Sequence, residues 1–594
     1  MLWARTERVP FKWAISSKSI VFLSSCEYRD NSHMDTPVKP ALNLKWINRF
    51  TRLGETFFTR LNPTPLPQVH WVSCNHALAA ELGLSPDWSE SPGLMEALSG
   101  CELLMGSEPL ASVYSGHQFG HWAGQLGDGR AIYLGEVSTE HGEFELQLKG
   151  AGVTPYSRSG DGRAVLRSSI REYLCSEAMH ALGIPTTRAL CITGSRGIVY
   201  REEPERAAVV TRISPSFIRF GHFEHFAAKG DVDSLRKLAD FVITHYSSHL
   251  DSAECADRIK LCDSEFKEKI AQNPYALLLY RVTHQTAKLI AHWQSVGFCH
   301  GVMNTDNMSI LGLTLDYGPF QFMDAYVPNH ICNHSDHSGR YAFDQQPNVA
   351  YWNLYCLGQA LIPLINDTEL TVQCLDSFKT AYPRFKLETI LKKMGISSLK
   401  DLSLNTPVDL QTPLEADRAL DGQKGLEDQA LKTARELVNE IDQIMSSDNV
   451  DFTIFWRSFS EGLSQLSNDS KFEVLGPLED NIHLARLKSV EALFQNPKTI
   501  QAWQDWFESY LNFLKSTDQD LKRVAKTMLG VNPKYVLRNH LGEAAIRSAE
   551  KGDFSEIEIL LKILSSPFDE HPEYQTYADL PPDWASSISI SCSS

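Results

Sequence analysis

The chain has 594 residues, of which 43% are hydrophobic and 22% are charged, a composition typical of globular proteins. This length exceeds what one hydrophobic core usually organises, so it predicts three or four domains or lobes. The net charge of -17 argues against a general nucleic-acid-binding protein and against a protein that binds anionic membranes, and it makes any local cluster of positive charge informative.

The cysteines and the hydropathy pattern narrow the class further. The 12 cysteines are scattered without a C-x-x-C pair, which argues against a zinc ribbon or a thioredoxin-like motif and fits a reducing compartment. No run of about 18 apolar residues is present to predict a transmembrane helix.

The first 33 residues are charged and contain only a short apolar segment, SIVFLSS, which is short for the apolar region of a signal peptide. Two interpretations are open. The segment is a weak mitochondrial presequence, or the start lies upstream of the true initiator, Met34. We prefer the second and exclude residues 1–33 from the fold, as an extension that is disordered or not native.

Residues 34–225 are predicted to form an N-terminal region and a small lobe. Up to residue 110, helix-like stretches alternate with proline-rich joints such as NPTPLPQ. The segments AIYLGEV and FELQLKG predict two strands joined by the turn STEHGE. Residues 164–183 have apolar residues at helical spacing and end at a Gly-x-Pro stop signal. ALCITGS, GIVY and AAVVTRI predict further strands, and this order is that of a kinase-like small lobe.

Residues 226–420 are predicted to form a large helical lobe, because segments such as SLRKLADFVITHYSS and NPYALLLYRVTHQTAKLIAHWQSVG have helical periodicity. A polar stretch near residues 400–425 predicts a loop or linker. Residues 421–587 predict a C-terminal helical region, and residues 588–594 predict a short flexible tail that contains Cys592.

The stretch HGVMNTDNMSILGLTLDYGPF, residues 300–320, resembles half of a kinase active site. Kinases place an aspartate two residues after the histidine, an asparagine five residues further on, and a D-x-G after a short hairpin. Asn307 and Asp316 keep this register, but Val302 stands at the position of the usual base. Asn307 and Asp316 offer hard oxygen ligands for Mg²⁺, with Asp306 as a further carboxylate; the alternative is a hairpin with a capping aspartate.

Two glycine-rich segments add candidate phosphate contacts. In GQLGDGR, residues 124–130, glycines let the backbone approach a phosphate and Arg130 adds a forked cation, although such a hairpin is also compatible with a purely structural role. The stretch KGAGVTPYSRSGDGRAVLRSSIREYL concentrates positive charge, which favours a polyphosphate ligand. Its cations are Lys149, Arg158, Arg163, Arg167 and Arg171. The alternative is a solvated helix face, since the last three recur every four residues.

Lys149 at a strand end and Glu172 in the next helix match the kinase pair in which a glutamate orients a lysine onto phosphates, with Glu177 as the fallback partner.

The segment ICNHSDHSGRYAFDQQP, residues 331–347, contains several potential metal ligands. They are Cys332, His334, Asp336 and His337. Their spacing is too tight for structural zinc pairs, so a polar loop beside the active site is the preferred interpretation.

These motifs together resemble the selenoprotein O family, also called the SelO or YdiU family, of protein adenylyltransferases. The diagnostic stretches are YSGHQFGHWAGQLGDGRA, the lysine and arginine segment, HGVMNTDNMSI with DYGPF, ICNHSDHSGRYAFDQQP and the terminal SCSS. The resemblance implies an α+β, protein-kinase-like bilobal fold of pseudokinase type with an additional helical C-terminal region. It also implies transfer of AMP, from ATP bound in a flipped orientation, to protein Ser, Thr or Tyr hydroxyls.

The resemblance also implies roles for individual residues. Asp306 takes the role of proton acceptor, and Asn307 and Asp316 hold Mg²⁺, with Mn²⁺ as an alternative. The nucleotide contacts fall on Gly127, Gly129, Arg130, Lys149, Asp161, Gly162, Arg212, Arg219 and Asp316, with Glu172 paired to the lysine. Cys592 stands where some members carry selenocysteine, which suggests a redox-sensitive disulfide with Cys332.

Two rival functions stay open at this point. One is a true kinase that transfers the γ-phosphate with a relocated base, and the other is a non-catalytic nucleotide-binding scaffold. The expected partners are ATP and protein substrates, with no nucleic acid and no membrane. A monomer in the cytoplasm of bacterial type is expected, with a mitochondrial location as the alternative.

Overall fold

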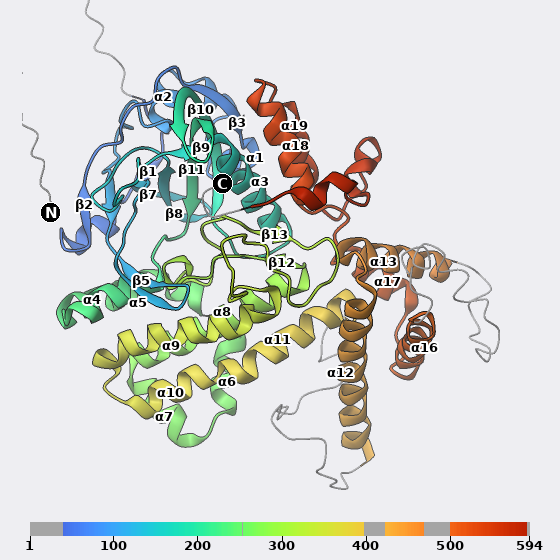
Figure 1. Ribbon diagram of the computed structural model, residues 1–594. Coiled ribbons are helices and arrows are strands. Elements are labelled where there is room, and N and C mark those ends of the chain that lie inside the picture. Colours follow the sequence, from blue (N-terminus) through green and yellow to red (C-terminus); the bar gives the residue numbers. More distant parts are fainter. Residues whose placement is uncertain (1–39, 252, 397–421, 469–498, 591–594) are drawn as a thin grey trace, which may run out of the picture. The chain divides into compact units, whose positions relative to one another are not determined.

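The fold is known from a computed structural model, which describes residues 40–251, 253–396, 422–468 and 499–590 (Figure 1). The predictions for residues 1–33, for most of the linker near 400–425 and for Cys592 lie outside the described residues. Within them the chain combines one large antiparallel sheet with an extensive helical part, a mixed α/β architecture. Among the described residues, no helix has the length and hydropathy needed to span a membrane.

The sheet has the order β2-β4-β7-β8-β11-β10-β3, and β1 and β9 pair with β7 and β11. Its strands are β1 (Lys45–Trp46), β2 (Phe58–Arg60), β3 (His70–Cys74), β4 (Leu110–Ser112), β7 (Ala131–Thr139), β8 (Gly142–Lys149), β9 (Ala164–Val165), β10 (Arg188–Tyr200) and β11 (Pro204–Ser214). Two short pairs lie apart from it: β5 (Ser115–Gln118) with β6 (His121–Gln125), and β12 (Phe298–Cys299) with β13 (Gln321–Phe322).

Strand β8 shows how the sheet places functional groups. Leu146 and Leu148 belong to a buried cluster that also contains Ile132 of the neighbouring β7. Because successive side chains of a strand point to opposite faces, Gln147 and Lys149 lie on the other face. The two strands predicted from AIYLGEV and FELQLKG are confirmed, and the paired register runs from Ala131 opposite Lys149 to the turn.

The helices of the middle and C-terminal parts of the chain follow the predicted periodicity. They are α3 (Leu166–Ala181), α4 (Phe220–Lys229), α5 (Val232–Leu250), α6 (Ala253–Leu261), α7 (Ser264–Gln272), α8 (Pro274–Ser295), α9 (Gln346–Ile365), α10 (Thr368–Asp376), α11 (Phe378–Lys393), α12 (Gly422–Asp448), α13 (Phe452–Asn468), α16 (Ile500–Ser516), α17 (Leu521–Leu529), α18 (Asn539–Glu550) and α19 (Ser555–Leu564).

Helix α3 connects the sheet to the C-terminal part of the chain. It packs against β10 and β11 and also against α18 and α19. Its side chains Ile170, Tyr173 and Leu174 are fully buried in the largest core cluster, which extends through α8 and α9. The helices α12, α13, α16 and α17 instead share a second core that is rich in tryptophan, with Trp456, Trp503 and Trp506. Glu172 of α3 is therefore held in place by the packing of this helix against the sheet and against α18 and α19.

Three local expectations are wrong. Residues before 110, expected to be helix-like between proline-rich joints, contain the strands β1 to β3 beside two short α-helices, α1 (His76–Glu81) and α2 (Leu94–Leu98). ALCITGS and GIVY lie in one strand, β10, whose register shifts between Gly194 and Ile198. The helix expected from residue 164 begins at Leu166, because the two residues before it pair with β11.

A buried ion cluster connects the C-terminal helices to the middle of the chain. The Arg538 guanidinium donates to both carboxylate oxygens of Asp451, at 2.8 Å each, and to Asp324 at 2.5 Å. Its side chain is 2% exposed, so water cannot replace these partners.

We predict that Arg538→Met lowers the free energy of unfolding by about 3–5 kcal/mol, because it leaves the buried carboxylate of Asp451 without its cation. Thermal or denaturant unfolding of the whole chain measures this. Arg547→Met is the matched control: its pair with Glu543 lies on the surface of α18, where the arginine is 57% exposed, and a loss of about 0–1 kcal/mol is expected. Equal losses of unfolding free energy in the two variants would contradict a stabilising role for the buried Arg538 ion pairs.

Candidate active site

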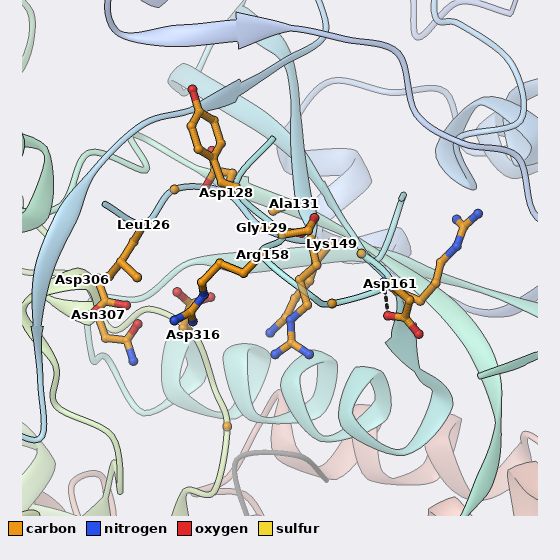
Figure 2. A pocket seen from close by; sticks show the side chains of 18 of the residues that line it. Leu126, Asp128, Gly129, Ala131, Lys149, Arg158, Asp161, Asp306, Asn307 and Asp316 are labelled. Atoms are coloured by element: carbon orange, nitrogen blue, oxygen red, sulfur yellow. Dashed lines mark hydrogen bonds between the residues drawn. The ribbon is translucent and has the colours of Figure 1, made fainter. Parts of the chain in front are cut away.

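A cleft of about 600 Å³ brings together the glycine-rich segment, the end of β8 and the 300–320 stretch (Figure 2). Most of the site residues expected from the sequence line it. These are Gly127, Gly129, Arg130, Lys149, Arg158, Asp161, Gly162, Arg163, Arg212, Arg219, Val302, Asp306, Asn307 and Asp316. The segments that carry them lie far apart in the sequence, so the fold gathers them into one site.

Two glycines of the cleft permit contacts that a larger residue would prevent. A Cβ atom on Gly127, where φ is +147°, would lie 2.4 Å from the Tyr156 ring, and one on Gly162 would lie 2.2 Å from the backbone of Gly152. Both contacts are closer than any real Cβ contact. The structural role that the sequence left open for residues 124–130 therefore accounts for Gly127, which lets that segment pack on Tyr156. Gly162 lets the loop between β8 and β9 close on itself at Gly152. These close contacts hold the neighbouring cations Arg130 and Arg158 at the cleft.

Lys149 and Glu172 form the predicted ion pair, with 2.5 Å between Nζ and Oε2 and both side chains buried. Burial, and then the charge of Arg212, lower the pKa of Lys149 to about 8. Burial would raise the pKa of Glu172, but Arg212 and Lys149 together lower it. The fallback partner Glu177 is wrong, because its carboxylate pairs with Arg188.

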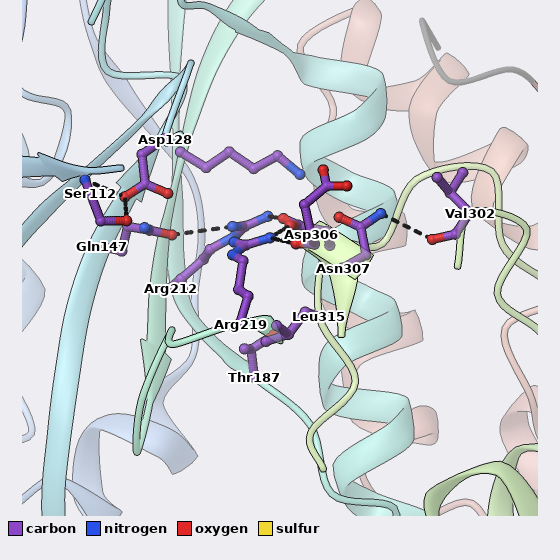
Figure 3. A network of polar contacts seen from close by, with 12 residues as sticks. Ser112, Asp128, Gln147, Thr187, Arg212, Arg219, Val302, Asp306, Asn307 and Leu315 are labelled. Atoms are coloured by element: carbon purple, nitrogen blue, oxygen red, sulfur yellow. Dashed lines mark hydrogen bonds and ion pairs between the residues drawn. The ribbon is translucent and has the colours of Figure 1, made fainter. Parts of the chain in front are cut away.

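Asp316 forms ion pairs with two arginines, Arg212 and Arg219, which are labelled in Figure 3. Arg212 donates to its Oδ1 at 2.5 Å, and Arg219 pairs with its Oδ2. Arg212 also pairs with Glu172 and donates to Gln147. Burial would raise the pKa of Asp316, but the two arginines hold it well below its usual value, so this carboxylate is ionised.

Asp306 has a very different environment. Gln118 donates to its Oδ2 at 3.2 Å, whereas its buried Oδ1 has no hydrogen-bond partner among the described residues. Burial raises the pKa of Asp306 to about 6. Arg219 donates to the backbone oxygen of Asp306 at 2.7 Å, not to its carboxylate. A buried carboxyl with an unpaired oxygen and a pKa near neutrality is suited to accept a proton.

The loop that carries Asp306 is fixed at both ends. The His300 ring bonds to the backbone oxygen of Leu315 at 2.8 Å and stacks on Trp293, which explains a histidine at this register position. Asn307 donates its amide nitrogen to the backbone oxygen of Val302 at 3.0 Å. The amide oxygen of Asn307 is therefore available at the cleft. Together with the ionised Asp316 it gives a hard oxygen donor set that fits a divalent cation such as Mg²⁺.

Two of the expected phosphate-binding arginines do not reach the cleft. Arg167 pairs with Glu543 at 2.6 Å, and Arg171 donates to the backbone oxygen of Phe320 at 2.7 Å. Both lie on α3, which packs against α18 and α19. Their guanidinium groups therefore bind other residues of the protein and are not available to a phosphate. Arg163 lines the cleft but donates to the backbone of residues 64 and 65. By contrast, Arg130 and Arg158 are exposed there, and neither has an ion pair with any residue that the structure describes.

Several site residues escaped the sequence prediction. Gln118, the partner of Asp306, lies inside the diagnostic stretch YSGHQFGHWAGQLGDGRA. Within that stretch the sequence predicted a role in phosphate binding for the glycines and Arg130 but no role for Gln118. Arg201 pairs with Asp161 at 2.8 Å and lowers its pKa. Asp161 is therefore a fixed residue at the cleft rather than a free carboxylate. The only available signal for Gln118 was its position beside the glycine-rich segment.

The ICNHSD loop is held by its own side chains. The Asp336 carboxylate accepts from the backbone nitrogens of Arg340 and Tyr341, at 3.0 and 2.7 Å, which supports the preferred interpretation of a polar loop. Cys332 is buried, and burial raises the pKa of its thiol well above the usual value. The backbone nitrogen of His334 donates to the oxygen of Ile590 at 2.9 Å. The end of the described chain therefore lies beside this loop.

Comparison with known proteins agrees with this site. A family model described as "Protein adenylyltransferase SelO" matches residues 40–565. The chain is 50% identical over 553 residues to the protein nucleotidyltransferase YdiU of Albidiferax ferrireducens, which covers 93% of this chain and 98% of the relative. The YdiU proteins of Variovorax paradoxus and Cupriavidus pinatubonensis are 50% and 49% identical, over 93% and 92% of this chain and 98% and 94% of each relative.

The matched residues include the whole cleft and all of its catalytic candidates. The chain therefore belongs to the SelO family of protein adenylyltransferases, the enzymes that transfer AMP from ATP to proteins.

Proposed function

We propose that this adenylyltransferase works on a kinase-like framework in which ATP is bound in the reversed orientation. The observation that carries the proposal is the pair of positions 302 and 306. Val302 stands where a kinase has its base, while Asp306 presents an unpaired carboxylate oxygen. The chemistry is therefore expected at Asp306, and the nucleotide has to bring its α-phosphorus to that residue.

The kinase-like framework is supported by the relation between the ion pair and the loop. Lys149 on β8 and Glu172 on α3 form the pair, and Asn307 and Asp316 line the same cleft. These are the parts that kinases use to bind phosphates and metal. A scaffold that only binds nucleotide would have no need for the complete set, which argues against the non-catalytic alternative.

The reversed orientation follows from where the positive charge lies. Attack on the α-phosphorus makes pyrophosphate the leaving group, and that group carries most of the developing charge. Lys149 and the two unpaired arginines, Arg130 and Arg158, are the cations available to it. In a site that is partly closed to water, such cations stabilise the transition state more than they could in solution. The β- and γ-phosphates therefore belong at these cations, and the α-phosphate belongs beside Asp306.

The transfer step needs one proton acceptor. The Ser, Thr or Tyr hydroxyl of a protein substrate gives its proton to Asp306 Oδ1 as its oxygen attacks the α-phosphorus. The bond between that phosphorus and the bridging oxygen of pyrophosphate breaks, and the protein keeps AMP as a phosphodiester. Asn307 and Asp316 would hold Mg²⁺, or Mn²⁺, which neutralises charge on the phosphates when bound. That the enzyme is a monomer and lies in the cytoplasm stays a prediction.

We predict that label reaches protein from ATP labelled at the α-phosphate and not from ATP labelled at the γ-phosphate. In a whole-cell extract with Mg²⁺, Asp306→Ala should lower the labelling about 10²- to 10⁴-fold, the usual contribution of a general base. Asp316→Ala should also abolish it, because the metal and the arginines lose their shared carboxylate. Label from γ-ATP would indicate a kinase, and no label from either would indicate a scaffold.

The rate should also follow the protonation of Asp306. Its pKa is raised to about 6, so the carboxylate accepts a proton above that pH, and AMP transfer should rise as the pH increases through about 6. The hydrogen bond from Gln118 lowers this pKa. Gln118→Leu should therefore move the rising limb to higher pH, whereas Gln125→Leu, an exposed residue of the same hairpin, should leave it in place. A limb that does not move in Gln118→Leu would exclude this role.

A redox control by the tail is the last part of the proposal. The backbone of His334 contacts the backbone of Ile590. His334 lies two residues after Cys332, and Ile590 lies two residues before Cys592. Because the Cys332 thiol is buried, we expect a peroxide to oxidise Cys592 first, to a sulfenic acid. The Cys332 sulfur then attacks the Cys592 sulfur, which forms the disulfide and releases water. Cys592→Ser should remove any difference in turnover between oxidised and reduced enzyme, and Cys101→Ser should retain it. A redox response that persists in Cys592→Ser would contradict the disulfide.

A further inference from the structure

A second group of potential metal ligands lies outside the nucleotide cleft. It consists of His117 on β5, Glu224 on α4 and Cys356 on α9, which are far apart in the sequence. One ligand atom from each residue lies within 4.8 Å of the other two. None of the three belongs to the residues that line the cleft, so the proposed AMP transfer gives this group no role.

Glu224 is the residue that most needs a further partner. Its side chain is 4% exposed. Its Oε1 lies 2.6 Å from Nδ1 of His117, but its buried Oε2 has no hydrogen-bond partner among the described residues. Burial also raises the pKa of Glu224. An unpaired oxygen in such a place costs free energy that a bound cation would recover.

The other two ligands are positioned to complete a site. The His117 ring is held edge-on between Trp122 and Trp352, with ring centroids 5.0 and 5.2 Å away. Cys356 is partly exposed, and its thiol has a pKa of about 12 because of burial and the charge of Glu224. His117 and Cys356 are both open to solvent in part, which gives an ion a route to the buried carboxylate.

The ligand types select the ion. An imidazole nitrogen, a carboxylate oxygen and a thiolate sulfur are the donors that bind Zn²⁺, whereas Mg²⁺ prefers oxygen alone. With bonds of about 2.0–2.3 Å, the ligand atoms of a tetrahedral zinc site lie about 3.4 Å apart. The His117 Nδ1 and Glu224 Oε1 atoms, now 2.6 Å apart, would therefore separate by about 1 Å, and the Cys356 sulfur would lie at a similar distance from both. The ion would also replace the hydrogen bond between His117 and Glu224.

We propose that His117, Glu224 and Cys356 bind a zinc ion, with water in the fourth position. The ion ties the β5–β6 hairpin to α4 and α9. The consequence reaches the active site, because the backbone nitrogen of His117 donates to the Thr305 hydroxyl at 2.8 Å and the next residue is Gln118. The ion is thus a structural support for the hairpin whose glutamine contacts Asp306.

The test uses the full chain, stripped with a chelator and dialysed against zinc with Mg²⁺ in excess, so that Mg²⁺ occupies the oxygen ligands of the cleft. Elemental analysis should find equimolar zinc in the wild type and in Cys262→Ser, a partly exposed cysteine elsewhere in the chain. Cys356→Ser and His117→Ala should lose it. Zinc should raise the thermal midpoint of the wild type but not that of the two variants.

Cobalt gives a readout that does not depend on the stability of the variants. Co²⁺ bound to a thiolate produces a sulfur-to-metal charge-transfer band in the near ultraviolet. The band should appear in the wild type and in Cys262→Ser and should be absent in Cys356→Ser. A wild type that binds no zinc, or a Cys356→Ser variant that keeps both the zinc and the band, would overturn the proposal and leave a hydrogen-bonded His117–Glu224 pair. None of these readouts involves AMP transfer.

Discussion

The site depends on the two ion pairs that the Asp316 carboxylate forms with arginines. This carboxylate pairs with Arg212 of β11 and with Arg219 at the start of α4, and Arg212 carries the connection on to Glu172 and Lys149. Asp316 itself has φ of +54°, a conformation that costs a residue other than glycine about 1–3 kcal/mol. The two arginines hold it there, so the strained residue and the ion network maintain each other.

This network contains three cations and two carboxylates, and it therefore retains positive charge after internal pairing. A buried excess of positive charge favours an anionic ligand. The exposed Arg130 and Arg158 add to it at the same cleft. A polyphosphate is the ligand of matching charge, and the location of the excess beside Lys149 is the physical reason for placing pyrophosphate at that end.

The two aspartates of the cleft illustrate how environment separates roles. Asp316 is ionised at every physiological pH because two arginines face it, while Asp306 has a pKa of about 6 because it is buried with a single weak partner. The first is suited to metal and the second to a proton. A pair of carboxyl groups with pKa values pushed apart in this way is the usual sign of divided labour in an active site.

The sequence predicted those features that depend on local pattern. The strands around residues 131–149 and the helix with Glu172 follow from periodicity, and the register of Asn307 and Asp316 follows from a motif. What it missed depends on neighbours distant in the chain. Arg167 and Arg171 are engaged by partners near residues 543 and 320, and Gln118 acts through a residue 188 positions away. The short strands before residue 110 were missed because their pairing partners, not their own pattern, define them.

The central claim is the direction in which ATP lies between the cation cluster and Asp306. The most direct test is a structure of the protein with a non-hydrolysable ATP analogue and Mg²⁺. We predict that the α-phosphorus lies beside Asp306 Oδ1 and that the β- and γ-phosphates contact Lys149 and Arg158. A γ-phosphorus beside Asp306, with the α-phosphate at the lysine, would contradict the account.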